Sequence, residues 1–130
     1  MKVLRLHHAQ VTIPPGAEDE ARAFYCGLLG LTETPKPDSL AGRGGFWLAL
    51  GDVQLHVGVE DDVDRHASKA HVAYEVDGLE AFRERLAAAG HPVTHGAAIP
   101  GLERFELRDP FGNRLELVQR KPAPRTIENR

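Results

Sequence analysis

Apolar and polar residues alternate along several short stretches of the chain, which is the pattern of strands that bury one face. Residues 7–13 place Ala9, Val11 and Ile13 on one face and polar side chains on the other. A tight turn at Gly51 and Asp52 joins two further stretches and predicts a hairpin. The pattern predicts strands at residues 7–13, 46–50, 53–59, 69–76, 105–108 and 114–119, with a short strand near 31–34.

Two other stretches space their apolar residues three and four positions apart, as an amphipathic helix does. The first begins at about Ala17 and is expected to end at Gly30. The second begins with a pair typical of a capping box, Asp77 and Glu80, and is expected to end at Gly90. Each helix has to cover the apolar face of a sheet.

The elements follow the order strand, helix and about three strands, and this order occurs twice. Module one covers about residues 4–60 and module two about residues 69–119, with a charged linker at 60–66. His8 and His71 stand at the start of the two modules. We therefore expect a single domain over residues 1–120, built from a repeated unit, and a loose C-terminal tail at 121–130.

Charge and hydropathy restrict the kinds of partner. The 130 residues include 16 Lys and Arg against 19 Asp and Glu, a formal charge of −3, which gives no electrostatic case for nucleic acid. The longest apolar run, residues 46–50, is far shorter than the ~20 residues that cross a bilayer, so no membrane association is expected. A single cysteine, Cys26, and a charged N-terminus favour a cytoplasmic location.

Strand alternation also places four residues with metal-binding side chains on the faces that the helices leave uncovered. These residues are His8, His56, His71 and Glu116, one on each of four strands and at matching positions of the two modules. Imidazole and carboxylate groups that converge in this way form a site for Zn²⁺, Ni²⁺, Mn²⁺ or Fe²⁺. Two histidines and one carboxylate are also the ligand set of non-haem iron oxygenases. Taken singly, each residue is explained as well by a solvated strand face.

Other residues have a functional and a simpler interpretation. Trp47 either lines the site or packs in the core, and the core is favoured. Glu75 is a candidate base or a solvated carboxylate, and Arg108 a candidate anion ligand or a solvated side chain. Cys26 is expected to be an inert small hydrophobic residue, and the glycines within residues 42–45 a flexible flap.

Four segments carry a resemblance to a known family. They are LHHAQV at residues 6–11, FY at 24–25 with LLGL at 28–31, AHVAY at 70–74 and DPFGNRLEL at 109–117. Over residues 6–119 the chain resembles the vicinal oxygen chelate superfamily, which includes glyoxalase I, fosfomycin-resistance proteins, bleomycin-resistance proteins and extradiol dioxygenases. The last segment is the most specific of the four.

The resemblance implies an α+β fold in which two βαβββ modules form a curved, cup-like mixed sheet, with helices on the outer face, around one divalent metal ion. The metal ligands of the family fall on His8, His71 and Glu116. His56 stands where glyoxalase I has a glutamate, so it is either a fourth ligand or a contact to the substrate. Glu116 or His56 would act as the catalytic base.

The resemblance favours a metal-dependent enzyme, a glyoxalase-like lyase or isomerase, that polarises a small oxygen-bearing substrate. An iron(II) dioxygenase is a second possibility. A third is a protein that binds a drug or metabolite without catalysis, although bleomycin-resistance proteins lack the metal ligands that this sequence keeps.

Each module alone has too little structure to close a deep site, so two modules must pair within one chain or between two chains. Relatives of this size commonly pair across chains. We therefore expect a homodimer whose sites are shared, with His8 and His56 from one chain and His71 and Glu116 from the other.

Overall fold

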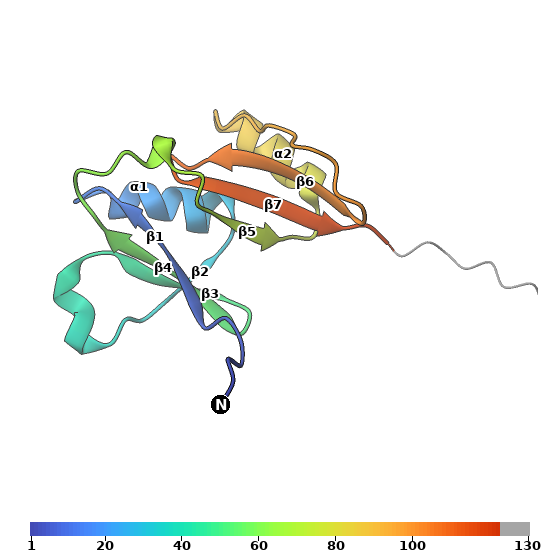
Figure 1. The fold of residues 1–130 in the computed structure, drawn as a ribbon. Helices are drawn as coiled ribbons and strands as arrows, with labels where there is room; N and C mark the ends of the chain where they lie inside the picture. Colours follow the sequence, from blue (N-terminus) through green and yellow to red (C-terminus); the bar gives the residue numbers. More distant parts are fainter. Residues whose placement is uncertain (123–130) are drawn as a thin grey trace, which may run out of the picture.

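The computed structural model describes residues 1–122 and contains two small mixed sheets, one for each half of the chain (Figure 1). The first sheet has the strand order β1-β4-β3-β2, with β1 parallel to β4 and the other pairs antiparallel. Its elements are β1 (His8–Ile13), α1 (Glu18–Arg22), the π-helical turn η1 (Ala23–Leu28), β2 (Thr32–Thr34), the 3₁₀ helix η2 (Asp38–Arg43), β3 (Phe46–Leu50) and β4 (Val53–Val59).

The second sheet has the order β5-β7-β6, again with its first strand parallel to its last. A single bridge between Thr94 and Glu106 stands where module one has β2. The repeated unit and the α+β class expected from the sequence are therefore confirmed. The elements of this half are the 3₁₀ turn η3 (Arg65–Ala67), β5 (His71–Glu75), α2 (Leu79–Ala88), β6 (Leu102–Arg108) and β7 (Arg114–Arg120).

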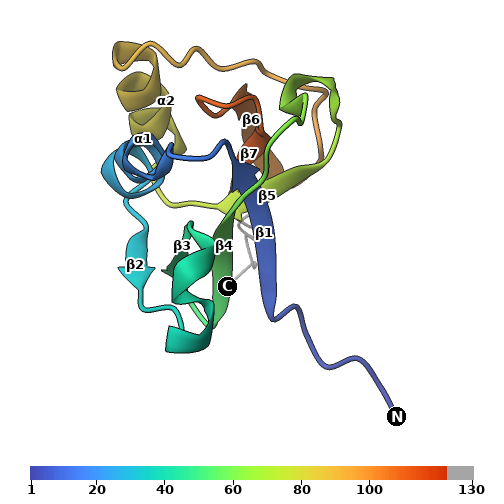
Figure 2. The ribbon, with the colours of Figure 1, turned by 90° about the vertical axis from the view of Figure 1, so that its left-hand side faces the viewer.

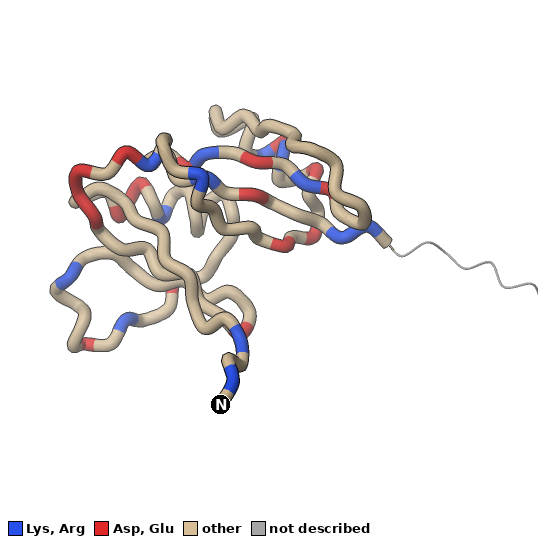
Figure 3. The backbone as a smooth tube through the Cα atoms, viewed as in Figure 1, with Lys and Arg blue, Asp and Glu red and all other residues tan. Residues whose placement is uncertain are grey.

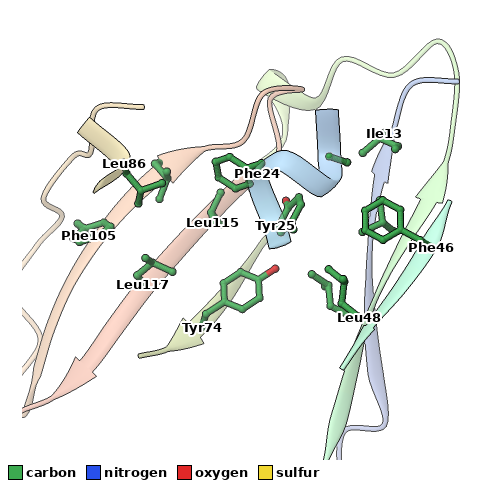
Figure 4. Packing of buried hydrophobic residues seen from close by; sticks show 14 of the residues in the cluster. Ile13, Phe24, Tyr25, Phe46, Leu48, Tyr74, Leu86, Phe105, Leu115 and Leu117 are labelled. Atoms are coloured by element: carbon green, nitrogen blue, oxygen red, sulfur yellow. The ribbon is translucent and has the colours of Figure 1, made fainter. Parts of the chain in front are cut away.

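One core serves both sheets. Phe24 and Tyr25 of η1 lie between the apolar face of the first sheet and that of the second (Figure 4). Ile13 and Leu48 approach this helical segment from one side, and Leu115 from the other. Both helices lie side by side over the core (Figure 2), and Arg85 of α2 donates a hydrogen bond to the carbonyl of Leu28. Because the apolar faces point inward, the polar faces of the two sheets point away from the shared core.

The helix boundaries differ in detail from the prediction. The first helix ends at Leu28, two residues before Gly30, as a π-helical turn in which the Leu29 N–H donates to the carbonyl of Phe24. The expected capping box is wrong, because the N-cap of the second helix is Gly78, with a left-handed φ of 82°, and no side chain caps the helix there. The N–H of Leu79 donates instead to the side-chain oxygen of Gln119, at 2.8 Å.

The glycine-rich loop is not a free flap. Residues Asp38–Arg43 form a 3₁₀ helix, and the N–H of Gly45 donates to a carboxylate oxygen of Glu18. A Cβ at Gly45 would collide with the carbonyl oxygen of Val57, and the φ of 74° also requires glycine. The loop is therefore packed against β4.

The linker between the modules is held by arginines. Arg65 is buried, and its guanidinium donates to the carbonyl of Glu60 and to the hydroxyl of Thr12. Arg108 donates to the carbonyls of Arg65, Ser68 and Gly112, so it joins this linker to the turn before β7. The interpretation of Arg108 as an anion ligand is therefore not supported.

Residues 123–130, most of the expected tail, lie outside the described residues. Within residues 1–122, no helix is long and apolar enough to cross a membrane.

Candidate functional site

The polar face of the first sheet carries three stacked rings. His56 of β4 lies between Trp47 of β3 and His8 of β1, with ring centroids 3.9 Å and 4.2 Å away and interplanar angles of 1° and 19°. Trp47 is opposite His56 in the β3–β4 register, which brings the two rings together. The core position favoured for Trp47 is therefore wrong, because this side chain lies on the polar face.

Hydrogen bonding and burial fix the state of His56. Its Nε2 lies 2.9 Å from Oε1 of Gln54, so Nε2 carries the proton and Nδ1 keeps a free lone pair. Burial lowers the pKa of His56, and the neighbouring His8 and His7 lower it further. Both effects favour the neutral imidazole, which is the form that binds a metal.

The polar face of the second sheet carries the other two predicted ligands. His71 of β5 donates its Nδ1 hydrogen to the carbonyl of Lys69, at 3.1 Å, so Nε2 is left as an acceptor. This Nε2 lies 3.5 Å from Oε2 of Glu116, and the Glu116 residue is 7% exposed. A cation placed between these two acceptors, either a proton or a metal ion, would be bound by both.

Arg104 orients the Glu116 carboxylate. Its Nη1 donates to Oε1 of Glu116 at 2.9 Å, which leaves Oε2 directed at His71. The same guanidinium contacts Glu106, which accepts a second bond from Arg114 at 2.6 Å. Sequence reasoning missed the role of Arg104, because the β6–β7 register that places it beside Glu116 is not visible in the strand pattern.

The two pairs of residues are equivalent by register. His8 pairs with Gln54 in the parallel β1–β4 ladder, and His56 follows two positions later. His71 pairs with Arg114 in the parallel β5–β7 ladder, and Glu116 likewise follows two positions later. We call the His8–His56 pair half-site one and the His71–Glu116 pair half-site two.

The half-sites do not meet within one chain. Each lies on the polar face of its sheet, and the apolar faces of both sheets enclose the helical segment of residues 23–28 (Figure 4). Among residues 1–122, no three His, Cys, Asp or Glu side chains come close enough to hold one metal ion. The four predicted ligands therefore do not form one site within the described part of a single chain.

The remaining candidates have structural roles. Glu75 pairs with Arg120 at 3.0 Å at an exposed strand end, which supports the solvated alternative rather than a catalytic base. Cys26 is half-buried, and burial raises the pKa of its thiol, as expected of an unreactive cysteine.

Two mixed sheets built from a repeated strand order, with His8 and His71 at matching positions, define a duplicated α+β class of protein. The chain matches the Glyoxalase/Bleomycin resistance protein/Dioxygenase superfamily over residues 5–117 and belongs to that family.

Solved structures share the fold. A protein from Bacillus anthracis, described provisionally as a glyoxalase family protein, is 40% identical, with a TM-score of 0.85 over 93% of this chain and 98% of that one. The fosfomycin resistance protein FosX from Listeria monocytogenes is 14% identical, with a TM-score of 0.73 over 89% of this chain and 91% of its own. At that identity, FosX supports the fold alone.

A curated relative is longer. The glyoxylase CFP32 of Mycobacterium bovis, a provisional assignment, is 34% identical over 108 residues, which is 82% of this chain. The chain spans about two fifths of the length of that relative, since the match covers 40% of it.

Proposed function

We propose that this protein is a metal-dependent enzyme of the glyoxalase type, which polarises a small oxygen-bearing substrate. The observation that carries the proposal is the pair of acceptor atoms in half-site two, His71 Nε2 and Glu116 Oε2, 3.5 Å apart. Two ligands of one Zn²⁺ ion, each bound at about 2.1 Å, have a similar separation. The Nδ1 bond of His71 to a backbone carbonyl is also the usual support for a histidine that binds a metal.

His8, His71 and Glu116 would hold the ion, with His56 as a fourth ligand or as a contact to the substrate. The donors are imidazole nitrogens and one carboxylate, which suit Zn²⁺, Ni²⁺, Mn²⁺ or Fe²⁺. The geometry of His8 and His56 supports this arrangement, because the stacked rings hold both imidazoles at the same face of the sheet.

A bound divalent ion would act as a Lewis acid and stabilise negative charge that develops on a substrate oxygen. Side chains of this protein would carry out the proton transfers. Burial lowers the pKa of His56 and so favours its neutral form, and its ring stacks on Trp47 and bonds Gln54, so its Nδ1 could accept a proton. Glu116 is the other candidate base, through the oxygen that Arg104 does not hold.

The proposed assembly is a homodimer in which half-site one of one chain faces half-site two of the other. Strands β1 and β5 support this, because each lies at the edge of its sheet and has one side without a strand partner. Pairing of these edges between two copies would satisfy their backbone groups and form two equivalent sites.

An iron(II) dioxygenase is the second candidate, because the proposed ligand set of two histidines and one carboxylate is typical of such enzymes. Bound iron with oxygen uptake in the presence of catechols would favour it. Tight ligand binding without turnover, retained in the Glu116→Ala variant, would favour a binding protein.

The proposal is tested by elemental analysis of protein purified without chelator, followed by calorimetric metal titration. We expect one ion per chain in the wild type and loss of binding in His71→Ala. Because His71 is outside the core, metal-free His71→Ala should differ from metal-free wild type by less than ~1 kcal/mol in unfolding free energy.

Glu75→Gln is the matched control for Glu116→Gln, since both remove a carboxylate from the polar face of the second sheet. Glu75→Gln should bind the ion normally and Glu116→Gln should not. Wild-type protein that binds none of the four ions would refute the proposal.

A further inference from the structure

A cavity of about 560 Å³ opens on the polar face of the first sheet. The three stacked rings of His8, His56 and Trp47 line it, together with the loop between β2 and β3. Its volume is in the range of sites for small molecules. Its charged or titratable lining residues are all basic, with no aspartate or glutamate among them: His7, His8, Lys36, Arg43 and His56.

The loop supplies two permanent positive charges. The ammonium of Lys36 donates to the carbonyl of Gly44 at 2.6 Å, which holds it at the cavity and leaves two of its hydrogens unused. Arg43 is exposed, and its guanidinium has no hydrogen bond or ion pair with any other residue of 1–122. Figure 3 shows basic and acidic positions on the loop between β2 and β3; Asp38, at the start of η2, does not line the cavity.

Two arginines on the polar face of the second sheet, in contrast, are paired with carboxylates. There Arg104 and Arg114 are neutralised by Glu106 and Glu116, at distances of 2.6–3.3 Å. The cavity of the first sheet has no carboxylate in its lining to neutralise Lys36 and Arg43. This basic lining is a local feature, since the whole chain has a formal charge of −3.

We propose that this cavity binds a small organic anion, with a carboxylate or phosphoryl group held by Arg43 and Lys36. Arginine binds both groups through two parallel hydrogen bonds, and lysine adds a point charge. The opposite end of such an anion would face His8 and His56. The inference thus rests on the proposed function in one respect, that this anion is the substrate of the metal site.

Trp47 makes the test direct, because it is the single tryptophan of the chain and lines the cavity. Metal-free protein, prepared with a chelator, is titrated with glycolate, methylphosphonate and the uncharged glycolamide while tryptophan fluorescence is recorded. We expect a saturable change with at least one anion, and none with glycolamide. The anion that responds distinguishes a carboxylate from a phosphoryl site, and added salt should weaken its binding.

Arg43→Gln should weaken binding of the anion by about tenfold or more, and Lys36→Gln should act in the same direction. Arg85→Gln, which removes one positive charge from α2 instead, should bind as the wild type does. Equal responses to glycolamide and to the anions, or unchanged binding in Arg43→Gln, would overturn the proposal. Metal affinity is measured separately on the same proteins and tests the proposed function. The proposed anion site and the proposed metal site can therefore fail independently.

Discussion

Tyr25 donates a hydrogen bond of 2.7 Å to the carboxylate of Asp109, which lies 84 residues further along the chain. Asp109 is 4% exposed and also accepts the backbone N–H groups of Phe111 and Asn113. The contact joins the helical segment of module one to the turn that precedes β7. It therefore sets how the two modules pack, and with them the directions in which the half-sites face.

Tyr25→Phe should lower the free energy of unfolding by about 1.5–3 kcal/mol, because it removes a buried hydrogen bond to a charged group. Tyr74 is the matched control, since its hydroxyl is buried without a hydrogen-bond partner among residues 1–122. Tyr74→Phe should equal or exceed the wild type in stability. Urea unfolding of both variants measures the difference, and equal losses would contradict the assigned role of the Tyr25 hydroxyl.

Alkaline pH should unfold the protein through the same two residues, which are its only tyrosines. Burial, followed by the nearby Asp109, raises the pKa of both Tyr25 and Tyr74. Below the unfolded-state pKa of about 10 both phenols are neutral in either state, and the full stability is present. Above it only the unfolded chain ionises, so stability falls by about 1.4 kcal/mol per pH unit for each tyrosine.

Urea unfolding between pH 9 and about pH 12 checks this dependence. The double variant Tyr25→Phe with Tyr74→Phe should lack the tyrosine contribution to the slope. A wild-type slope that persists unchanged in the double variant would assign the effect to other groups.

The strands of the fold could be predicted from the sequence, because apolar and polar residues alternate along each strand and mark its two faces directly. Both strands of the first hairpin have the predicted bounds, at residues 46–50 and 53–59. The start of α2 was not accessible, because its first free N–H is satisfied by Gln119, from a strand 40 residues away. The residues around a helix start do not indicate a hydrogen-bond acceptor that the tertiary fold places there from a distant strand.

Only part of the candidate site could be predicted from the sequence. Strand parity placed His8, His56, His71 and Glu116 on the correct faces, and the ladders give them equivalent registers. The position of Trp47 was misjudged, because its size favoured the core whereas its strand parity, opposite to that of Leu48, placed it beside His56. Parity is therefore the stronger guide on a strand that has one polar face.

Mixing of two inactive variants tests whether the sites are shared between chains. His8→Ala and Glu116→Ala homodimers should each be inactive, because every site in them lacks a ligand. A mixed dimer should regain one intact site of two, since the other site carries both substitutions. Metal content and turnover of the separated mixed dimer measure this. A mixed dimer that stays metal-free would place each site within one chain.

Arg104→Met should lower metal affinity by about 10–100-fold, as is typical when a residue that supports a ligand is removed. The reason is that Oε1 of Glu116 loses its donor, so the carboxylate is no longer held with Oε2 toward His71. Arg104→Lys keeps the charge and should recover part of the affinity. Calorimetric titration with Zn²⁺ or Mn²⁺ checks both variants, and unchanged affinity in Arg104→Met would exclude this supporting role.

In the proposed dimer, the opposite directions of the two half-sites would make metal occupancy depend on protein concentration. In the proposed dimer, dissociation divides every coordination sphere in two, so dilution should release the ion just as a chelator does. By the same linkage, added metal should favour association of the subunits, because the ion would bind the complete site of the dimer more tightly than one half-site. The ion would then act as the bond between the chains as well as the reactive centre.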